Sequence, residues 1–195
     1  MSDLFDFPVL RVEQPRKMLP TQVRYEIFNA DNALLAVAAE TDVRSRRKAL
    51  LAARPGALPD VRSLVVSGAD GAPLLTVEQQ ESRRLTLVRR PDGELVGAIR
   101  AERTTRHYTL LGAADQPVGT ITGDLSLRHF VVSDDQGRRA ALVNKKWAGL
   151  LAELLTTADR YAVEISDPVP EPLRTLVVMS AVVLDLTLHE FKDLV

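Results

Sequence analysis

The residues that could carry chemistry are few in this chain of 195 amino acids. Cysteine is absent, which excludes thiol catalysis, thiolate metal sites and disulfide bonds. The sequence contains no Gly-x-Ser-x-Gly nucleophile elbow, no phosphate-binding P-loop and no Gly-x-Gly-x-x-Gly dinucleotide fingerprint. Because no set of residues has the spacing of a known catalytic site, we predict a protein that is not an enzyme and holds no cofactor. An enzyme without a recognisable motif stays open as an alternative, since active sites occur on many folds.

Two histidines invite a metal hypothesis. His107 and His129 stand at the centres of the similar tripeptides Arg106-His107-Tyr108 and Arg128-His129-Phe130. If these lie on alternate strands of an antiparallel meander, their backbones are about 10 Å apart. Two nitrogens that share a zinc ion, each bonded at about 2 Å, must lie much closer together. We therefore interpret the histidines as equivalent positions of a repeat rather than as metal ligands.

Basic residues recur in adjacent pairs and could bind an anionic ligand. The pairs are Arg83-Arg84, Arg89-Arg90, Arg138-Arg139 and Lys145-Lys146, and Arg44 to Lys48 adds a basic cluster. On one interpretation they face lipid headgroups, where each basic residue contributes about 1 kcal/mol. On the other they are solvated strand ends that discourage edge pairing. The candidate headgroup contacts are Arg138, Arg139, Lys145 and Lys146. With 25 basic and 26 acidic residues, the chain lacks the basic excess of a nucleic-acid-binding protein.

A sequence repeat indicates how these side chains are positioned. Asp70-Gly71 recurs as Asp92-Gly93, and at the same interval Leu95 to Ile99 is echoed by Pro117 to Ile121. Each unit alternates apolar and polar residues, reaches an Asp/Gly turn and alternates again, which is typical of antiparallel hairpins. A βαβ unit, which needs about 30 residues, is longer than this interval. We expect turns in which both central residues have positive φ, a conformation that Asp and Gly tolerate.

Twelve such runs of strand-forming residues can be counted. They lie near residues 8–13, 22–29, 33–40, 62–67, 73–79, 83–89, 94–102, 106–112, 117–123, 127–133, 138–144 and 160–165. Twelve antiparallel strands leave no exposed edge if they close into a barrel. The sequence therefore predicts a mainly β protein built as a closed antiparallel barrel.

Two helices are predicted after the eleventh run. Trp147 and Leu150 to Leu155 have helical spacing, and we expect Trp147 to pack against the barrel rather than to anchor in a membrane interface. The last helix begins at Pro172, and its residues 176–188 are apolar on nearly every face. Leu173 to Leu188 is shorter than the roughly 20 residues of a membrane span, so we expect this helix to fill the barrel. Asp185 within it then needs a buried partner, such as Arg, Lys or backbone amides.

The C-terminal quarter resembles the phospholipid scramblase family. Lys145-Lys146-Trp147-Ala148-Gly149 is similar to its basic-x-Trp-x-Gly signature, and Ala158-Asp159 before Tyr161 fits the continuation. Val182 to Glu190, with Asp185 and Glu190, resembles the terminal apolar helix of the family. The resemblance implies one domain over residues 1–195 with the fold shared by scramblases, LURP-one-related proteins and Tubby C-terminal domains, a twelve-stranded barrel around a hydrophobic helix. It also implies structural roles for Trp147, Gly149, Asp185 and Glu190.

The resemblance raises the question of calcium. The proposed calcium segment of the family begins with an acidic residue where this chain has Thr157. The remaining candidates are Asp159, Glu164 and Asp167, whereas calcium takes six to eight oxygen ligands. We therefore expect no cofactor, with calcium at these three residues as the alternative.

The function implied by the resemblance is association with phospholipid. We expect a cytoplasmic, non-enzymatic protein that binds anionic phospholipid peripherally at the inner face of the plasma membrane and binds no nucleic acid. Transbilayer scrambling is implied by the family only. The alternatives are a soluble interaction or regulatory module without lipid affinity and an uncharacterised enzyme that uses the mouth of the barrel.

Overall fold

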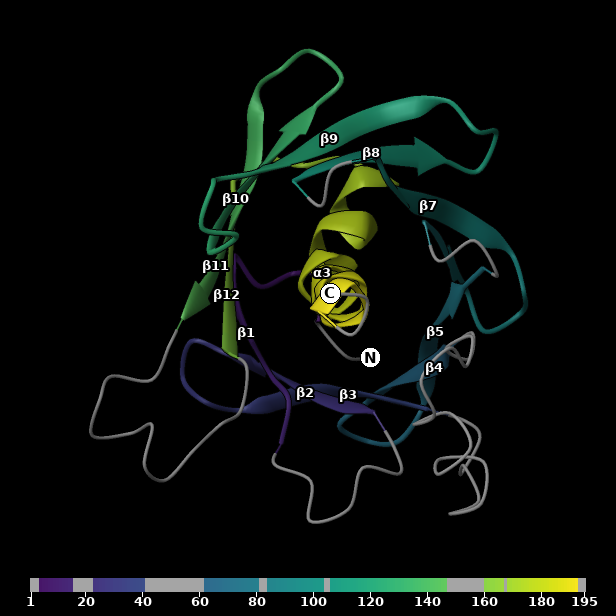
Figure 1. Cartoon of the computed structure of the whole chain (residues 1–195). Helices are drawn as coiled ribbons and strands as arrows, with labels where there is room; N and C mark the ends of the chain where they lie inside the picture. The colour runs from purple at the N-terminus through teal and green to yellow at the C-terminus, as the bar shows by residue number, and fades with distance from the viewer. Residues whose placement is uncertain are drawn as a thin grey trace.

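Twelve antiparallel strands surround a single long helix in the part of the chain that the structure describes (Figure 1). This computed structural model describes residues 4–15, 23–40, 62–80, 84–103, 106–146, 160–166 and 168–192. The elements are β1 (Val9–Glu13), β2 (Arg24–Asn29), β3 (Leu34–Glu40), β4 (Ser63–Gly68), β5 (Pro73–Gln79), β6 (Leu85–Arg89), β7 (Leu95–Ala101), β8 (His107–Gly112), β9 (Pro117–Gly123), β10 (His129–Asp134), β11 (Arg139–Lys146), β12 (Arg160–Ile165) and α3 (Leu173–Lys192).

Each strand pairs with its neighbours in sequence, and β1 pairs with β12 to close the barrel. The twelve predicted strands are confirmed, and their observed ends lie close to the predicted ones. Inward and outward side chains alternate along most strands, as in β4, where Leu64, Val66 and Gly68 are buried. This alternation is the period of two that a strand with one buried face requires.

The two ends of the barrel differ in their connections. Five short hairpin turns, at residues 29–33, 68–72, 90–94, 112–116 and 134–138, lie at one end, which we call the turn end. We call the opposite end the tail end. At the tail end, residues 124–128 join β9 to β10. The helix α3 begins at the turn end and runs towards the tail end, where its C-terminal residues lie.

The five turns at the turn end share one geometry, and it differs from the predicted one. Only one residue of each turn has positive φ, namely Asn32, Gly71, Gly93, Asp115 and Gly137. The pairing register also shifts just before each turn. These are the features of a hairpin loop built from a type I turn whose last residue lies in a bulge. The prediction of two positive φ values was wrong because Asp70 and Asp92 act through their side chains, which accept the amides of Ala72 and Glu94 at 3.0 Å.

The core of the barrel is α3. From Leu176 to Leu188 every residue of this helix is buried, which confirms the predicted central position of the apolar helix. Its first turn is tied to the N-terminal segment, since the Arg174 Nε donates to the carbonyl of Phe5 at 2.8 Å. Leu4, in the same segment, is fully buried. Residues from both ends of the sequence therefore meet at the turn end of the barrel.

Glycines of the repeat let α3 approach the barrel wall. A Cβ atom at Gly97 in β7 would lie 3.2 Å from the Leu176 side chain and would collide with the carbonyl oxygen of Leu111. A Cβ atom at Gly119, the equivalent repeat position in β9, would lie 3.1 Å from the side chain of Leu173. The same repeat position thus leaves room for successive turns of the helix.

This approach makes Gly97 a sensitive position. We expect Gly97→Ala to lower the free energy of unfolding by about 1–3 kcal/mol, because the new methyl group overpacks the wall against a backbone oxygen and α3. Chemical denaturation followed by circular dichroism measures the change. Gly112→Ala is the matched control, since its Cβ would meet the flexible side chain of Gln116. Equal stability of the two variants would contradict the tight approach of α3.

Candidate functional site

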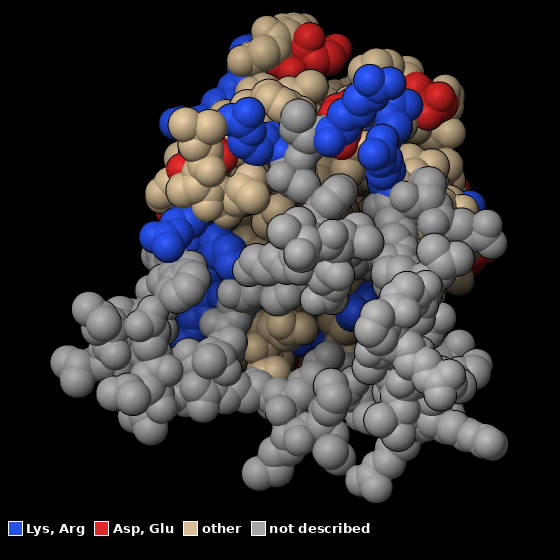
Figure 2. Space-filling view, in the orientation of Figure 1, with Lys and Arg blue, Asp and Glu red and all other residues tan. Residues whose placement is uncertain are grey.

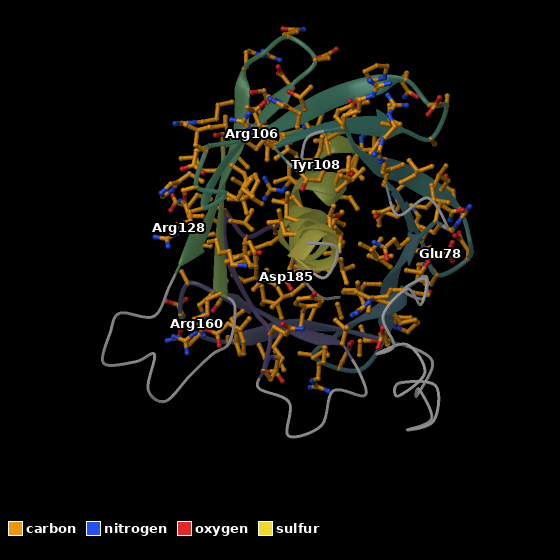
Figure 3. All side chains as sticks on the ribbon, in the orientation of Figure 1. Glu78, Arg106, Tyr108, Arg128, Arg160 and Asp185 are labelled. Carbon is orange, nitrogen blue, oxygen red and sulfur yellow. The ribbon has the colours of Figure 1, made fainter. Side chains whose placement is uncertain are left out.

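Asp185 is the most unusual group in the core. Its carboxylate is fully buried in the C-terminal half of α3. Tyr25 from β2 donates its hydroxyl to Oδ2 at 2.8 Å, and Tyr161 from β12 donates to Oδ1 at 3.0 Å. The Lys145 Nζ lies 3.8 Å from Oδ1 and 5.2 Å from the centre of the Tyr161 ring. We call Tyr25, Lys145, Tyr161 and Asp185 the Asp185 cluster, and Figure 3 labels Asp185 on the central helix.

The expectation that Asp185 pairs with a basic residue is confirmed, with Lys145 as that residue. The two tyrosines were not foreseen from the sequence. Tyr25 lies 160 residues from Asp185, and nothing local marks it as a partner. The position of Tyr25 in its strand could have identified it. A tyrosine that faces inward near the end of a strand lies at the same level as the last turns of a helix that runs through the barrel.

Within the Asp185 cluster, Tyr25 holds its proton more tightly than a free tyrosine does. Burial raises the pKa of Tyr25 well above 10, and the negative charge of Asp185 and the hydrogen bond to it raise this pKa further. Tyr25 therefore remains a hydroxyl donor throughout the physiological range. With its side chains buried among β2, β11, β12 and α3, the cluster joins the helix to the barrel wall.

Removal of the buried charge tests this role. We expect Asp185→Asn to lower the free energy of unfolding by about 3–5 kcal/mol, because it leaves the Lys145 ammonium, whose side chain is 9% exposed, without its carboxylate. Urea unfolding measures the loss. In a double-mutant cycle, Lys145→Met combined with Asp185→Asn should cost less than the sum of the single changes. Strict additivity would show that the two groups do not interact.

Alkaline pH provides a second test. Because the pKa of Tyr25 is raised on folding, its protonated form is favoured in the folded state, and its contribution to stability is complete below the unfolded pKa of about 10. We expect stability to fall as the pH rises above 10 and to fall less steeply in Tyr25→Phe. Melting temperatures measured from pH 8 to 11 with both proteins check this, and parallel curves would contradict it. Tyr108, whose pKa is also raised by burial, contributes to the decline that remains in this variant.

The four candidate headgroup residues do not lie together. Arg138 and Arg139 precede or begin β11 at the turn end, and Lys145 and Lys146 finish it at the tail end. At the rise of a strand, Arg139 and Lys145 are about 20 Å apart. The Lys145 side chain belongs to the Asp185 cluster inside the barrel, whereas Arg138 is exposed and forms a 2.8 Å ion pair with Asp134. A single patch made of all four side chains is therefore not formed.

The calcium candidates are only partly described. Glu164 is exposed on β12, opposite Val9 of β1 and Leu142 of β11. Asp159 and Asp167 lie outside the described residues, as do Trp147 and Gly149. In the described part of the chain, no group of three or more His, Asp or Glu residues is arranged to hold a metal ion. Calcium binding by Asp159, Glu164 and Asp167 stays a prediction.

The two histidines occupy the expected strands. His107 begins β8 and His129 begins β10, with β9 between them. The His129 Nδ1 lies 2.9 Å from the amide oxygen of Asn144 on the neighbouring strand. Glu190, for which the sequence predicted a structural role, lies in the last turns of α3.

A second set of basic residues follows the repeat and was missed in the sequence. Arg62, Arg84, Arg106 and Arg128 are spaced by one repeat interval and stand just before the first residues of β4, β6, β8 and β10. The carbonyl of each accepts the amide of a residue on a neighbouring strand, respectively Gln79, Ala101, Gly123 and Lys145. The equal hydrogen bonds show that the four arginines are equivalent positions, all at the tail end. The sequence did contain the pattern, because Arg106 and Arg128 begin the two Arg-His tripeptides. Applying the same repeat interval towards the N-terminus would have identified Arg84 and Arg62.

Other charged groups of the tail end are paired. Arg62 lies 3.9 Å from Glu40, Arg100 lies 3.7 Å from Glu102, and Arg160 lies 3.3 Å from Glu13. Figure 2 shows groups of Lys and Arg side chains on the outer surface, and Figure 3 shows Arg106, Arg128 and Arg160 along one side of the barrel wall.

The barrel and its central helix define the class of this protein. A closed twelve-stranded antiparallel barrel threaded by a C-terminal helix is the Tubby-like fold. The crystal structure of a protein from Arabidopsis thaliana is similar, with a TM-score of 0.57 over 92% of this chain and 91% of that one at 13% sequence identity, which shows a shared fold. The family model described as Scramblase matches residues 18–191, and the chain belongs to this family.

No curated protein sequence matches this chain. Among the described helical residues, none form a helix that is both long and apolar enough to cross a membrane.

Proposed function

We propose that this protein is a non-enzymatic, scramblase-like protein that associates peripherally with anionic phospholipid. The observation that carries the proposal is membership of the Scramblase family over residues 18–191, nearly the whole chain. Family membership supports a lipid-associated role at a coarse level. The preference for anionic lipid and the peripheral mode are the finer steps that we add.

The position of α3 supports the peripheral mode. The apolar side chains of residues 176–188 are buried within the barrel, where they form the core against the strands. Removing them from the barrel would expose the inward faces of the strands, at a cost of about 25 cal/mol for each Å² of apolar surface. Contact with a bilayer therefore falls to residues on the outer surface. Transbilayer movement of lipid rests on the family alone and is not part of the proposal.

The anionic preference has to come from the distribution of charge. The net charge of the chain is −1, so the molecule as a whole is not drawn to an anionic bilayer. Attraction requires basic side chains gathered on one region, where each contributes about 1 kcal/mol to binding near the surface. The tail end, with arginines that recur once in each repeat, offers such a region.

Vesicle flotation tests the proposal. We expect the purified protein to float with vesicles made of equal parts phosphatidylserine and phosphatidylcholine and to remain unbound with phosphatidylcholine alone. Binding should weaken as salt is raised, since exposed charges are screened beyond about 10 Å at 0.1 M ionic strength. Failure to float with either vesicle would contradict the proposal and would favour an interaction module without lipid affinity.

The same experiment separates the calcium alternatives. We expect equal flotation with calcium and with a chelator, because the sequence supplies too few oxygen ligands for a calcium site. Binding that needs calcium would instead favour a site at Asp159, Glu164 and Asp167. The variant Glu164→Gln, at an exposed position of β12, would then be expected to reduce the calcium response.

A further inference from the structure

We propose that the barrel docks on an anionic membrane end-on, with its tail end against the lipid and Leu125 inserted between headgroups. The basic contacts are Arg84, Arg103, Arg106 and Arg128, which we call the arginine rim. This inference rests on the proposed function and adds the surface, the orientation and the apolar anchor. It replaces the patch that the sequence predicted, whose residues lie at opposite ends of β11.

The arginine rim is a consequence of the repeat. Arg84, Arg106 and Arg128 precede β6, β8 and β10, so one strand separates each from the next. At about 4.8 Å between neighbouring strands, the three backbone positions are about 10 Å apart around the barrel. Arg103 follows β7 at the same end and adds a fourth charge. Side chains spaced in this way fit several separate headgroups better than one phosphate.

Three arginines of the rim are not neutralised by the described carboxylates. Arg84 and Arg103 are exposed, as is Arg128, and Arg106 is half-buried. In the described ranges of the chain, no ion pair within 4 Å joins Arg84, Arg103 or Arg106 to an Asp or Glu. The tail end therefore keeps positive charge that its described carboxylates do not balance.

The described residues at the opposite end of the barrel are mainly acidic. Its turns contain a repeated series of exposed acidic residues, Asp31, Asp70, Asp92, Glu94, Asp115 and Asp135. The arginines that lie among them are largely paired, with Arg90 at 3.3 Å from Glu94 and Arg138 at 2.8 Å from Asp134. An anionic surface attracts one end and repels the other, and this difference orients the barrel on the membrane.

Leu125 supplies an apolar contact at the same end. Its exposed fraction is 88%, whereas the other exposed large hydrophobic residues of the described chain, Val9, Leu34 and Val131, reach 37%, 39% and 39%. Leu125 lies in the turn that precedes Arg128, at the edge of the arginine rim. A leucine next to basic residues suits an interface in which charges meet headgroups and an apolar group enters the acyl boundary.

The turn that presents Leu125 is held by one carboxylate. Asp124 accepts the Ser126 hydroxyl at 2.7 Å and the amides of Arg128 and His129 at 3.0 and 3.3 Å. These hydrogen bonds lower the pKa of Asp124, that of Ser126 most, so the carboxylate stays ionised at neutral pH. Leu127 adopts φ of 54°, which turns the chain back into β10. Leu125 is thus fixed outward by the turn rather than left exposed by a lack of structure.

A membrane fits these features better than a nucleic acid. A single strand of nucleic acid binds along a basic groove with aromatic side chains that stack on the bases. The arginine rim follows the circumference of a barrel end, and its neighbouring apolar group is a leucine. A flat array of anionic headgroups can contact all of the spaced arginines at once, and the lipid layer beneath the headgroups can accept the apolar anchor.

Charge removal at the two ends gives the first test. We compare the triple variant Arg84→Gln, Arg106→Gln, Arg128→Gln with the turn-end variant Arg90→Gln, Arg138→Gln, Arg139→Gln, which loses the same charge. For vesicles of equal parts phosphatidylserine and phosphatidylcholine, we expect the rim variant to bind about a hundredfold more weakly, from about fivefold for each arginine. The turn-end variant should bind like the wild type. Thermal melts of both variants verify that the barrel is folded.

The outcomes separate this inference from the proposed function. If the wild type does not float with anionic vesicles, the proposed function fails and the inference fails with it. If the wild type floats and only the turn-end variant loses binding, the proposed function stands and the end-on orientation is overturned in favour of Arg138 and Arg139. A competition experiment adds soluble glycerophosphoserine or RNA to the protein bound to vesicles. If either competitor binds the protein as tightly as the vesicles do and displaces it from them, the membrane assignment is overturned.

A fluorescent label provides a direct test of orientation. Because the chain has no cysteine, Leu125→Cys and Asp92→Cys each create a single attachment site for an environment-sensitive fluorophore. We expect anionic vesicles to shift the emission of the label at position 125 to shorter wavelength and to leave the label at position 92 unchanged. A larger emission shift at position 92 than at position 125 would overturn the orientation. The orientation would also be overturned if the protein labelled at position 125 floated with the vesicles without a shift in emission.

Discussion

The structure depends on enclosing a helix that is apolar on nearly every face. Such a helix cannot lie on the surface of a protein in water, because no orientation hides all of its side chains. A single sheet would cover one side of it, whereas a closed barrel covers every side and leaves no strand edge open. The N-terminal segment adds to this enclosure, since Arg174 at the start of α3 bonds to the backbone of Phe5 and Phe7.

The Asp185 cluster defines how deeply the helix sits in the barrel. An apolar helix in an apolar barrel could slide without losing much contact area. Moving α3 by one turn, about 5.4 Å, would take the carboxylate away from Tyr25, Lys145 and Tyr161 together. A buried carboxylate without partners is costly, so the cluster opposes such a shift. The core thus combines a general apolar attraction with one polar interaction that selects a single position.

The repeat explains both the regularity of the barrel and its charge. With each repeat the chain returns to the same end of the barrel. A residue type that recurs at one position of the repeat therefore recurs around that end. Acidic residues of the turns collect at one end, and arginines at the starts of strands collect at the other. Although the net charge of the chain is −1, its described charged residues are therefore distributed unevenly between the two ends. The same repetition places Gly97 and Gly119 at equivalent positions, where side chains of α3 pack closely against the barrel wall.

The sequence alone predicted the strands, their number and the central helix, because alternation and helical apolarity are local patterns present within each segment. It did not determine the turn geometry, since Asp-Gly suits more than one hairpin turn and the bulge in the pairing register selects between them. Only the tertiary structure separated Arg139 from Lys145 by the length of β11, brought Tyr25 to Asp185 across 160 residues and gathered the arginine rim at one end. Which side chains meet depends on strand direction and on barrel closure, and these exist only when all twelve strands are paired.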